Sequence, residues 1–387
     1  MKKIKVMTVF GTRPEAIKMA PLVRELKKRD TFDCIVAVTG QHREMLDQVL
    51  ELFEIVPEYD LNIMKKSQTL VDITTGVLSG ITEIIEKEKP DIVLVHGDTT
   101  TTMASSLAAY YTKTMLGHVE AGLRTDNKFE PFPEEINRRI TGVLTDIHFS
   151  PTSNAKKNLL LENTPEENIF ITGNTVIDAL SSTISGDYVF TVPELNEIDY
   201  KNRRVIAITA HRRENLGEPL ENICRAIKRL TEDYPDTYAV YAVHRNPAVM
   251  EPVHRILGGC ENVLLLPPLD LEDMHNLMAR SYFVMTDSGG LQEEVPSMGK
   301  PVLVLRNVTE RPEGIEAGTL KLAGVKEEDI YREGKILLCD PEEYNRMAVA
   351  KNPFGDGHAS ERIADAMEYR FGLRAEKPEA FGDSPRA

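Results

Sequence analysis

Three carboxylates stand at positions from which an acid and a base could act on one substrate. Asp98 and Glu120 each follow a short apolar run, and Glu134 lies in the first turn of a helical segment that a proline opens. Carboxylates after neighbouring strands are a common arrangement of a general acid and a general base. Simpler interpretations stay open, because Asp98 could cap the next helix, Glu120 could pair with Arg124, and Glu134 could pair with Arg138.

The first basic segment, GTRPEAIK, starts at Gly11. Its Thr12 and Glu15 form a capping box, which by itself would explain a well-started helix. Arg13 does not fit that explanation, because a cation at a helix N-terminus opposes the helix dipole unless an anion is bound there. We therefore predict an anion-binding or catalytic role for Arg13.

A second set of cations lies in the later half of the chain. The segment His211–Arg213 follows one apolar run, and Ser288–Gly290 leads from another run into a helix. Backbone N–H groups at such a turn attract an anion, and Glu294 could accept hydrogen bonds from vicinal hydroxyls. Together with Arg306 and Arg311, these residues predict a site for a diphosphate.

The sequence lacks the motifs of several other chemistries. It contains no GxGxxG, GxxxxGK[ST], HExxH or GxSxG segment, so use of NAD, P-loop use of ATP, and zinc hydrolysis are unsupported. Its four cysteines are far apart and show no ligand spacing, which indicates buried thiols in a reducing compartment. We predict neither a metal nor another cofactor.

Composition limits the partners. The chain has 46 basic and 61 acidic residues, a net charge of −15, so nucleic acid is an unfavourable partner. The longest apolar runs are of strand length and too short to span a membrane. The N-terminal apolar stretch is broken at once by Gly11, Arg13 and Pro14 and is no signal peptide, so we expect a cytoplasmic protein.

The elements that must position these residues are alternating strands and helices. Short β-branched runs without polar alternation, such as Ile4–Phe10, Met115–Val119 and Phe283–Thr286, alternate with helical stretches such as Leu291–Met298. This alternation predicts parallel sheets covered on both faces. The pattern stops near Gly173 and restarts at Val205–Thr209. We predict an α/β fold with a first domain over residues 1–172 and a second over 173–359. A C-terminal helix near 360–373 rejoins the first domain, and 374–387 form a disordered tail.

The motifs in their order resemble one family. GTRPEAIK, HGDTTTT, HVEAGLRT, PFPEEINRR, HRREN and SGGLQEE followed by TERPEG are similar to those of the non-hydrolysing UDP-N-acetylglucosamine 2-epimerases, over Gly11 to about Arg311. The resemblance implies two facing Rossmann-like domains of the glycosyltransferase B type, with the active site in the cleft between them. It also implies a homodimer that interconverts UDP-GlcNAc and UDP-ManNAc without metal or nicotinamide.

The resemblance also implies roles for individual residues. Asp98, Glu120 and Glu134 match the catalytic carboxylates of the family, and His211 matches a histidine near the pyrophosphate. The remaining matches are expected to bind substrate: Arg13, Lys18, Arg138, Arg212, His244, Ser288, Gly289, Gly290, Glu294 and Arg311.

The residues suit one chemical route. The C2–H of the sugar is not alpha to a carbonyl, so direct deprotonation is too costly, and transient oxidation would need NAD. Loss of UDP remains: as the C1–O bond breaks, C2–H becomes acidic and a carboxylate removes it. The product is enclosed 2-acetamidoglucal, and UDP adds back after a proton returns on the other face.

One part of the family pattern is altered. Several bacterial relatives are activated by a second UDP-sugar at a segment that corresponds to Gln41 and His42, and this chain keeps both residues. Glu44 stands where the family pattern has Gln, and Ser67 stands where it has Arg. We therefore predict weak or no activation. The alternative functions are a UDP-sugar glycosyltransferase of the same fold and a catalytically silent UDP-sugar-binding regulator.

Overall fold

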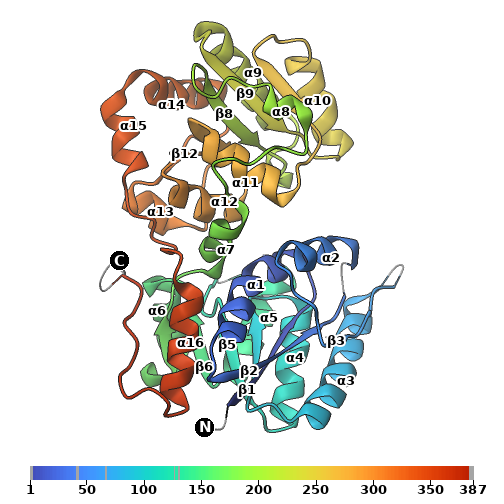
Figure 1. Cartoon of the computed structure of the whole chain (residues 1–387). Helices are drawn as coiled ribbons and strands as arrows, with labels where there is room; N and C mark the ends of the chain where they lie inside the picture. The colour runs from blue at the N-terminus through green and yellow to red at the C-terminus, as the bar shows by residue number, and fades with distance from the viewer. Residues whose placement is uncertain (1–2, 41–42, 66–67, 126, 130, 383–387) are drawn as a thin grey trace. The chain divides into compact units, whose positions relative to one another are not determined.

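The chain folds into two compact units. The computed structural model describes residues 3–40, 43–65, 68–125, 127–129 and 131–382. The first unit comprises Met1–Ser182 and Gly355–Ala387, and the second comprises Thr183–Phe354 (Figure 1). The sequence predicted a change of domain after residue 172, whereas the first unit extends to residue 182, almost to the end of helix α7 (Thr175–Thr183).

The first unit is built around a parallel sheet. In the described residues the strand order is β3-β2-β1-β4-β5-β6-β7, and every neighbouring pair is parallel. Its strands are β1 (Ile4–Phe10), β2 (Phe32–Val38), β3 (Tyr59–Asp60), β4 (Ile92–His96), β5 (Met115–Val119), β6 (Ile147–Ser150) and β7 (Ile169–Ile171). Its helices, besides α7, are α1 (Arg13–Lys28), α2 (Arg43–Leu52), α3 (Leu70–Glu88), α4 (Thr100–Tyr111), α5 (Glu134–Leu144), α6 (Ser153–Leu161), the 3-10 turn η1 (Glu166–Asn168) and α16 (Ala359–Arg370).

The second unit repeats this architecture. Its sheet has the order β10-β9-β8-β11-β12-β13, again with parallel neighbours. Its strands are β8 (Arg204–Thr209), β9 (Thr237–Ala242), β10 (Val263–Leu266), β11 (Phe283–Thr286), β12 (Val302–Val304) and β13 (Leu320–Leu322). Its helices are α8 (Pro193–Asn196), η2 (Arg213–Asn215), α9 (Glu218–Asp233), α10 (Pro247–Leu257), α11 (Leu271–Arg280), α12 (Gly289–Glu294), η3 (Val295–Met298), α13 (Pro312–Ala317), α14 (Glu327–Cys339) and α15 (Pro341–Ala348).

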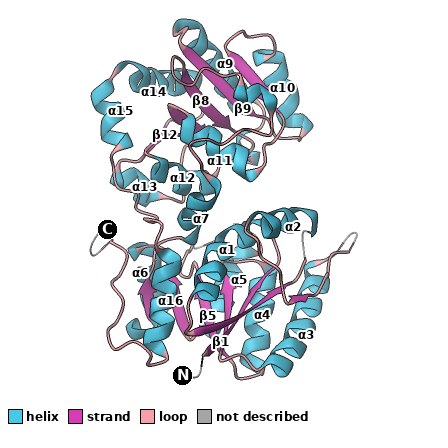
Figure 2. Cartoon of the chain, viewed as in Figure 1, coloured by secondary structure: helices cyan, strands magenta, loops and turns pink. Residues whose placement is uncertain are grey.

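Helices cover the strands of both sheets (Figure 2). Strand β8 shows why this arrangement suits the sequence: Ile206 and Ile208 pack into one core cluster, while Val205 and Ala207 pack into another. Successive side chains of a strand point to opposite faces, so both faces of the sheet are buried. Both faces therefore need apolar residues, and the run is continuously apolar. The prediction of doubly covered parallel sheets is confirmed.

The strand order in each unit fixes where ligands can be bound. In the first sheet the chain crosses from one side of β1 to the other between β3 and β4, and in the second it crosses β8 between β10 and β11. Ligands in open α/β sheets bind at such a switch point, outside the carboxyl ends of the strands. The loops after β1, β4 and β5 in the first unit, and after β8 and β11 in the second, are therefore the candidate binding loops.

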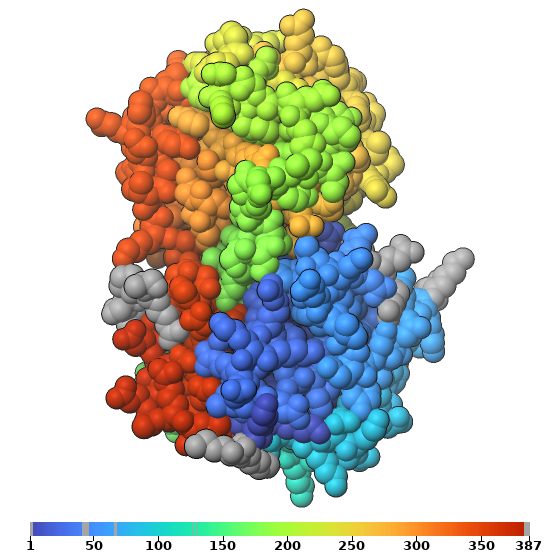
Figure 3. Space-filling view, in the orientation of Figure 1, coloured from blue at the N-terminus to red at the C-terminus, as the bar shows by residue number. Residues whose placement is uncertain are grey.

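The C-terminal part of the chain packs on the first unit. The Arg29 guanidinium, after α1, donates to Asp365 of α16 at 2.7 Å and to Glu368 at 3.2 Å. Figure 3 shows segments from the two ends of the chain, blue and red, side by side on the surface of this unit. The sequence predicted a disordered tail from residue 374, but residues 374–382 pack on this unit. Pro378 is buried, and the Phe381 N–H donates to Ile171 O of the edge strand β7 at 2.8 Å.

Among the described residues, no helix has both the length and the apolar composition needed to cross a membrane.

Candidate active site

Glu120 is held in an unusual backbone conformation directly after β5. Its φ is 64°, in the left-handed region that non-glycine residues rarely adopt. The Lys18 ammonium of α1 forms an ion pair with Glu120 Oε1, and the Asn174 amide donates to the same oxygen at 3.0 Å. Glu120 Oε2 lies 3.9 Å from His96 Nε2. The side chain is only 8% exposed, so its charge is balanced almost entirely by protein groups.

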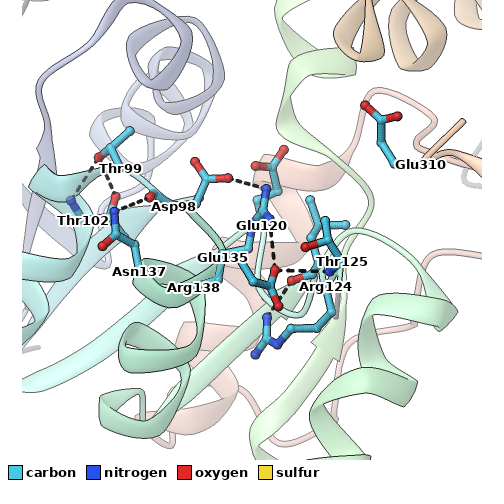
Figure 4. Close-up of polar contacts among 12 residues, drawn as sticks. Asp98, Thr99, Thr102, Glu120, Arg124, Thr125, Glu135, Asn137, Arg138 and Glu310 are labelled. Atoms are coloured by element: carbon cyan, nitrogen blue, oxygen red, sulfur yellow. Dashed lines mark hydrogen bonds and ion pairs between the residues drawn. The ribbon is translucent and has the colours of Figure 1, made fainter. Parts of the chain in front are cut away.

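Asp98, after β4, is fixed by α5. Its carboxylate forms an ion pair of 2.5 Å with Arg138, which also donates to Glu135 at 3.4 Å (Figure 4). The Asn137 amide donates to the Asp98 carbonyl at 2.9 Å. The interpretation of Asp98 as a helix cap is wrong, because Thr99 caps α4 by accepting from the Thr102 N–H at 3.1 Å. The Asp98 side chain is therefore directed to Arg138.

Glu134 is the first residue of α5. Its Oε2 is buried and has no hydrogen-bond partner among the residues that the structure describes. The expected pair with Arg138 is not formed there, since Arg138 is engaged by Asp98 and Glu135. A carboxylate oxygen at a helix N-terminus without a protein partner is suited to accept a proton or a hydrogen bond from a ligand.

Glu15 links the loops that carry these groups. The capping box with Thr12 is confirmed, and Glu15 Oε2 accepts from the Gly11 and Thr12 N–H groups at 3.1 and 2.8 Å. Its Oε1 accepts from the Thr99 and Thr102 hydroxyls at 2.6 and 3.2 Å. Burial raises the pKa of Glu15, against these hydrogen bonds, which lower it. One buried carboxylate thus joins the loop after β1 to the N-terminus of α4.

Gly11 lets this junction close. A Cβ at this position would lie 1.9 Å from Thr39 Oγ1 and 2.9 Å from Thr101 Oγ1, so no larger residue fits. The next cation, Arg13, is half-buried at the start of α1 and makes no hydrogen bond or ion pair with the described part of the chain. Its position agrees with the predicted role in binding an anion.

Three histidines lie on the neighbouring strands β4, β5 and β6, where His118 and His148 are paired in register and His96 is one residue further along its strand. His96, His118 and His148 are buried, and burial lowers their pKa values to about 4, about 3 and about 4. Their rings are therefore neutral at pH 7, and His118 Nε2 lies 2.7 Å from the Gly97 carbonyl. A neutral His96, with Nε2 3.9 Å from Glu120 Oε2, adds no positive charge beside that carboxylate.

In the second unit, Asp287 organises the loops after β8 and β11. It is fully buried, and its Oδ2 accepts from the His211 and Arg212 N–H groups at 2.8 Å each. The Asn215 amide donates to the same oxygen at 2.9 Å. The basic loop after β8 is thereby tied to the loop that carries Ser288–Gly290.

Two histidines stack at these strand ends. The rings of His211 and His244 lie 5.2 Å apart, with 12° between their planes. The Asn246 N–H donates to His244 Nδ1 at 3.1 Å, so in the neutral ring the proton is on Nε2, the atom available to an anion. Burial lowers the pKa of His211, although the charge of Asp287 raises it. His211 is half-exposed and can take part in hydrogen bonding to a ligand.

Two arginines approach the backbone of Gly289. A Cβ built on this glycine would lie 3.8 Å from Nη2 of both Arg212 and Arg311, and 3.1 Å from Glu310 Oε1. Arg311 is oriented by an ion pair with Glu293. Burial alone would raise the pKa of Glu310, but its backbone hydrogen bond and the charges of Arg306 and Arg311 lower it overall. Bare backbone and two guanidinium groups together can bind a diphosphate.

Glu294, at the end of α12, has a buried partner. His275 Nε2 lies 3.2 Å from Glu294 Oε2, and the Glu294 side chain is 12% exposed. Its other oxygen faces Gly290, since a Cβ there would lie 3.4 Å from Oε1. The carboxylate therefore curls back towards the Gly-rich turn, where it can accept hydrogen bonds from hydroxyl groups.

The sequence matches the family model for UDP-N-acetylglucosamine 2-epimerase over residues 24–368. The chain belongs to the UDP-N-acetylglucosamine 2-epimerase family. It is 58% identical to the UDP-N-acetylglucosamine 2-epimerase of Bacillus subtilis over 381 residues, which cover 98% of this chain and 99% of the relative.

Solved structures agree with this assignment to the epimerase family. The co-structure of S. aureus MnaA with UDP has a TM-score of 0.87 and 50% identity, covering 98% of this chain and 100% of that one. The UDP-GlcNAc 2-epimerase of Neisseria meningitidis, bound to UDP-GlcNAc, has a TM-score of 0.85 and 50% identity, covering 94% and 100%. The predicted family and its two Rossmann-like domains are confirmed.

The structure gathers the predicted epimerase residues into two sets, one in each unit. The first set lies at the carboxyl edge of the first sheet and on its adjoining helices: Arg13, Lys18, Asp98, Glu120, Glu134 and Arg138. The second lies around the ends of β8, β9 and β11: His211, Arg212, His244, Ser288, Gly289, Gly290, Glu294 and Arg311. The predicted regulatory residues Gln41 and His42 lie outside the described residues.

Several residues that shape these sets were missed by sequence reasoning. Asp287 and His275 are buried partners whose contacts join segments far apart in the sequence. His96, His118 and His148 had a signal, because each lies within or at the end of an apolar run that is otherwise free of polar side chains. A polar residue in a doubly covered strand needs a specific reason to be there.

Proposed function

We propose that this chain catalyses the reversible C2 epimerisation of UDP-GlcNAc to UDP-ManNAc. Family membership supports this proposal, as does the solved relative from Neisseria meningitidis that is bound to UDP-GlcNAc. The observation that carries it is the placement of Asp98, Glu120 and Glu134 at one edge of the first sheet, with two of them held by cations and the third with an unpartnered oxygen. Binding an anionic ligand alone does not require three carboxylates.

The second unit supplies the groups that suit UDP. Arg212 and Arg311 approach the backbone of Gly289, and the His211 and His244 rings offer hydrogen-bond donors. These groups can neutralise the diphosphate, both when UDP is bound and when negative charge develops on it as it leaves. Glu294 can accept hydrogen bonds from the ribose hydroxyls. We assign nucleotide binding to this unit and proton transfer to the first.

The proposed reaction is an elimination followed by addition. The electrons of the C1–O bond leave with the UDP oxygen, a carboxylate takes the proton from C2, and the C2–H electrons form the C1=C2 bond of 2-acetamidoglucal. A proton then returns to C2 on the opposite face, and the UDP oxygen bonds to C1 again. Each step is balanced without an oxidant, a reductant or a metal. Asp98, Glu120 and Glu134 provide the proton-transferring groups on the two faces.

The decisive experiment is proton NMR of the protein with UDP-GlcNAc alone in D2O. We expect UDP-ManNAc to form without an acceptor, with one deuterium at C2, because the abstracted proton resides on a carboxylate that exchanges with water. Treatment with EDTA is expected to leave the rate unchanged. Full retention of hydrogen at C2 would contradict the proton-transfer mechanism. Release of UDP only after an acceptor is added would indicate a glycosyltransferase instead.

We further propose that the product supplies N-acetylmannosamine-type sugars for surface polysaccharide or glycoprotein synthesis. The resemblance also implies a homodimer, and light scattering of the purified chain tests this prediction directly.

A further inference from the structure

A buried histidine in the second unit stands behind the carboxylate to which we assign the ribose contact. His275 of α11 is 1% exposed, and so is its neighbour Asn276. The ring makes two polar contacts: Nε2 lies 3.2 Å from Glu294 Oε2, and Nδ1 lies 2.7 Å from the hydroxyl of Thr183. Thr183 is itself buried, with 3% of its surface exposed. The side chains of Thr183, His275 and Glu294 thus form a buried hydrogen-bonded series that ends beside Gly290.

The chemistry of the partners fixes the direction of these hydrogen bonds. An ionised carboxylate only accepts, so His275 Nε2 must carry the hydrogen that points to Glu294. In a neutral ring Nδ1 then accepts, and the Thr183 hydroxyl donates to it. The carboxylate therefore selects the tautomer whose N–H is directed at it, and the Thr183 hydroxyl pairs with the other ring nitrogen at 2.7 Å.

The backbone next to these three side chains is also held by hydrogen bonds. The Asn276 amide donates to the Thr183 carbonyl at 2.7 Å and accepts from the Ser185 N–H at 3.1 Å. These bonds hold Thr183, the last residue of α7, against α11 beside His275. The Glu294 carboxylate is thus oriented from a rigid helix, and its other oxygen is left facing Gly290.

We propose that His275 is a positioning residue for nucleotide recognition: it holds Glu294 so that Oε1 accepts hydrogen bonds from the ribose hydroxyls. This inference rests on the proposed function, which places UDP on the second unit. His275 contacts neither nucleotide nor sugar and acts only through Glu294. Its effect should therefore appear in the discrimination between ribose and a ribose without hydroxyls, and not in the affinity for the rest of the nucleotide.

The test measures the affinity of the full chain for UDP and for 2′,3′-dideoxy-UDP by isothermal titration calorimetry. In the wild type we expect the dideoxy compound to bind about 10–100-fold more weakly, the usual range when hydrogen bonds to a charged partner are lost. The His275→Asn variant keeps a polar atom near Nδ1 but loses the donor at Nε2. We expect it to bind UDP roughly 10-fold more weakly and to bind the dideoxy compound within about 2-fold of the wild type.

The matched variant is His275→Gln, whose amide nitrogen can reach the position of Nε2. It is expected to keep the ratio of the two affinities within about 3-fold of the wild type. If His275→Asn does not fold, Thr183→Val serves instead, because it removes the hydroxyl that pairs with His275 Nδ1. That variant is expected to reduce the ratio by about 3-fold or more.

The results separate the inference from the proposed function. A wild type that does not bind UDP would contradict the nucleotide site itself, and one that binds both compounds equally would remove the ribose contact on which this inference depends. If the wild type discriminates, an equal loss of both affinities in His275→Asn would show a packing role only. The inference would also be overturned if His275→Asn kept the wild-type ratio of affinities for UDP and 2′,3′-dideoxy-UDP. The same holds if His275→Gln reduced that ratio as much as His275→Asn does.

Discussion

The three carboxylates of the first unit differ in how their charges are balanced. Asp98 faces a guanidinium, Glu120 faces an ammonium and an amide, and Glu134 has a buried oxygen without a partner in the described chain. The ion pairs fix the positions of the Asp98 and Glu120 carboxylates. The oxygen of Glu134 without a partner among the described residues is the one open to a hydrogen bond from a ligand.

This difference leads to a first prediction at the scale of single residues. Asp98→Asn, Glu120→Gln and Glu134→Gln should each lower kcat by about 10²–10⁴-fold, the usual effect of losing a positioned acid or base. Each change keeps the shape of the side chain and removes its ability to transfer a proton. The measurement is the initial rate of UDP-ManNAc formation.

The control for this series is Glu166→Gln, which removes only an exposed ion pair with Lys156. This variant should turn over like the wild type. If one of the three site variants also does so, that carboxylate is not catalytic, and its ion pair or position at a helix start is its whole role.

At the residue scale, local sequence patterns predicted the local contacts and failed for distant ones. The capping box of Thr12 and Glu15 is confirmed, because both residues lie in one helical turn. The expected pair of Glu120 with Arg124 is wrong: these residues are not in a helix, and Arg124 donates to both Glu162 oxygens at 2.8 and 2.6 Å. No spacing rule applies to partners on different elements.

At the scale of elements, Glu15 determines how two helices meet the sheet. It accepts hydrogen bonds at the starts of both α1 and α4. Arg13 is the first residue of α1, and Asp98 lies just before α4. An amide at this position would keep one acceptor oxygen and turn a donor towards groups that are themselves donors. The loops after β1 and β4 would then lose their common support.

We therefore predict that Glu15→Gln destabilises the chain by about 1–3 kcal/mol, the cost of leaving buried donors unpaired. It should also lower kcat by roughly 10-fold, since small displacements of positioned groups have such effects. Urea unfolding and initial rates measure the two quantities. The control is Glu25→Gln, on the same helix but paired with Arg29. An unchanged kcat in Glu15→Gln would show that this support is not needed for catalysis.

The histidines on β4, β5 and β6 make the first sheet sensitive to acid. The folded pKa of His148 is lowered to about 4 from 6.5, so the unfolded chain takes up a proton first as the pH falls. The neutral ring thus contributes full stability above pH 6.5, and this contribution is lost progressively between pH 6.5 and 4. At pH 5 the loss from one such histidine is on the order of 2 kcal/mol.

His148→Gln isolates this contribution, because glutamine does not titrate. We expect the free energy of unfolding in urea to fall less between pH 7.5 and pH 5 in this variant than in the wild type, by about 1–2 kcal/mol. Other titrating groups are common to both chains and cancel in the comparison. An equal fall in both would mean that His148 is protonated alike in the folded and unfolded states.

The sequence predicted the longer elements well and the shortest ones poorly. The runs Ile4–Phe10, Met115–Val119 and Phe283–Thr286 are strands with the expected bounds. The helix expected over Leu291–Met298 is instead α12 followed by a 3-10 turn. Pro296 explains the change, because it lacks the N–H that a continuing α-helix would need. The edge strands β3 and β7, of two and three residues, carry too little pattern to be seen.

At the scale of the whole molecule, repetition was the strongest signal. Two series of strands and helices predicted two α/β domains, and both sheets have the same order about their first strand. The boundary was harder to place, because α7 follows β7 as each earlier helix follows its strand. The C-terminal segment was expected to be disordered from its composition, but buried Pro378 and the bond from Phe381 to β7 hold it on the first unit.

The last prediction concerns regulation of the whole enzyme by its substrate. If a second UDP-sugar site activated this enzyme, UDP-ManNAc alone would react poorly until UDP-GlcNAc is added. This chain keeps Gln41 and His42 of the corresponding segment, but has Glu44 and Ser67 in place of a neutral amide and a cation. A carboxylate gained and a cation lost should weaken binding of a pyrophosphate by on the order of 1–3 kcal/mol.

That change corresponds to a loss of roughly 5–150-fold in affinity for the activator, enough to leave such a site empty at ordinary concentrations. Reaction of UDP-ManNAc alone should then begin without a lag and follow a hyperbolic dependence on concentration. The double variant Glu44→Gln with Ser67→Arg restores the expected charges and should introduce a lag that UDP-GlcNAc removes. A lag in the wild type, abolished by trace UDP-GlcNAc, would contradict this prediction, because it would mean that Gln41, His42 and their neighbours bind the activator despite the altered charges.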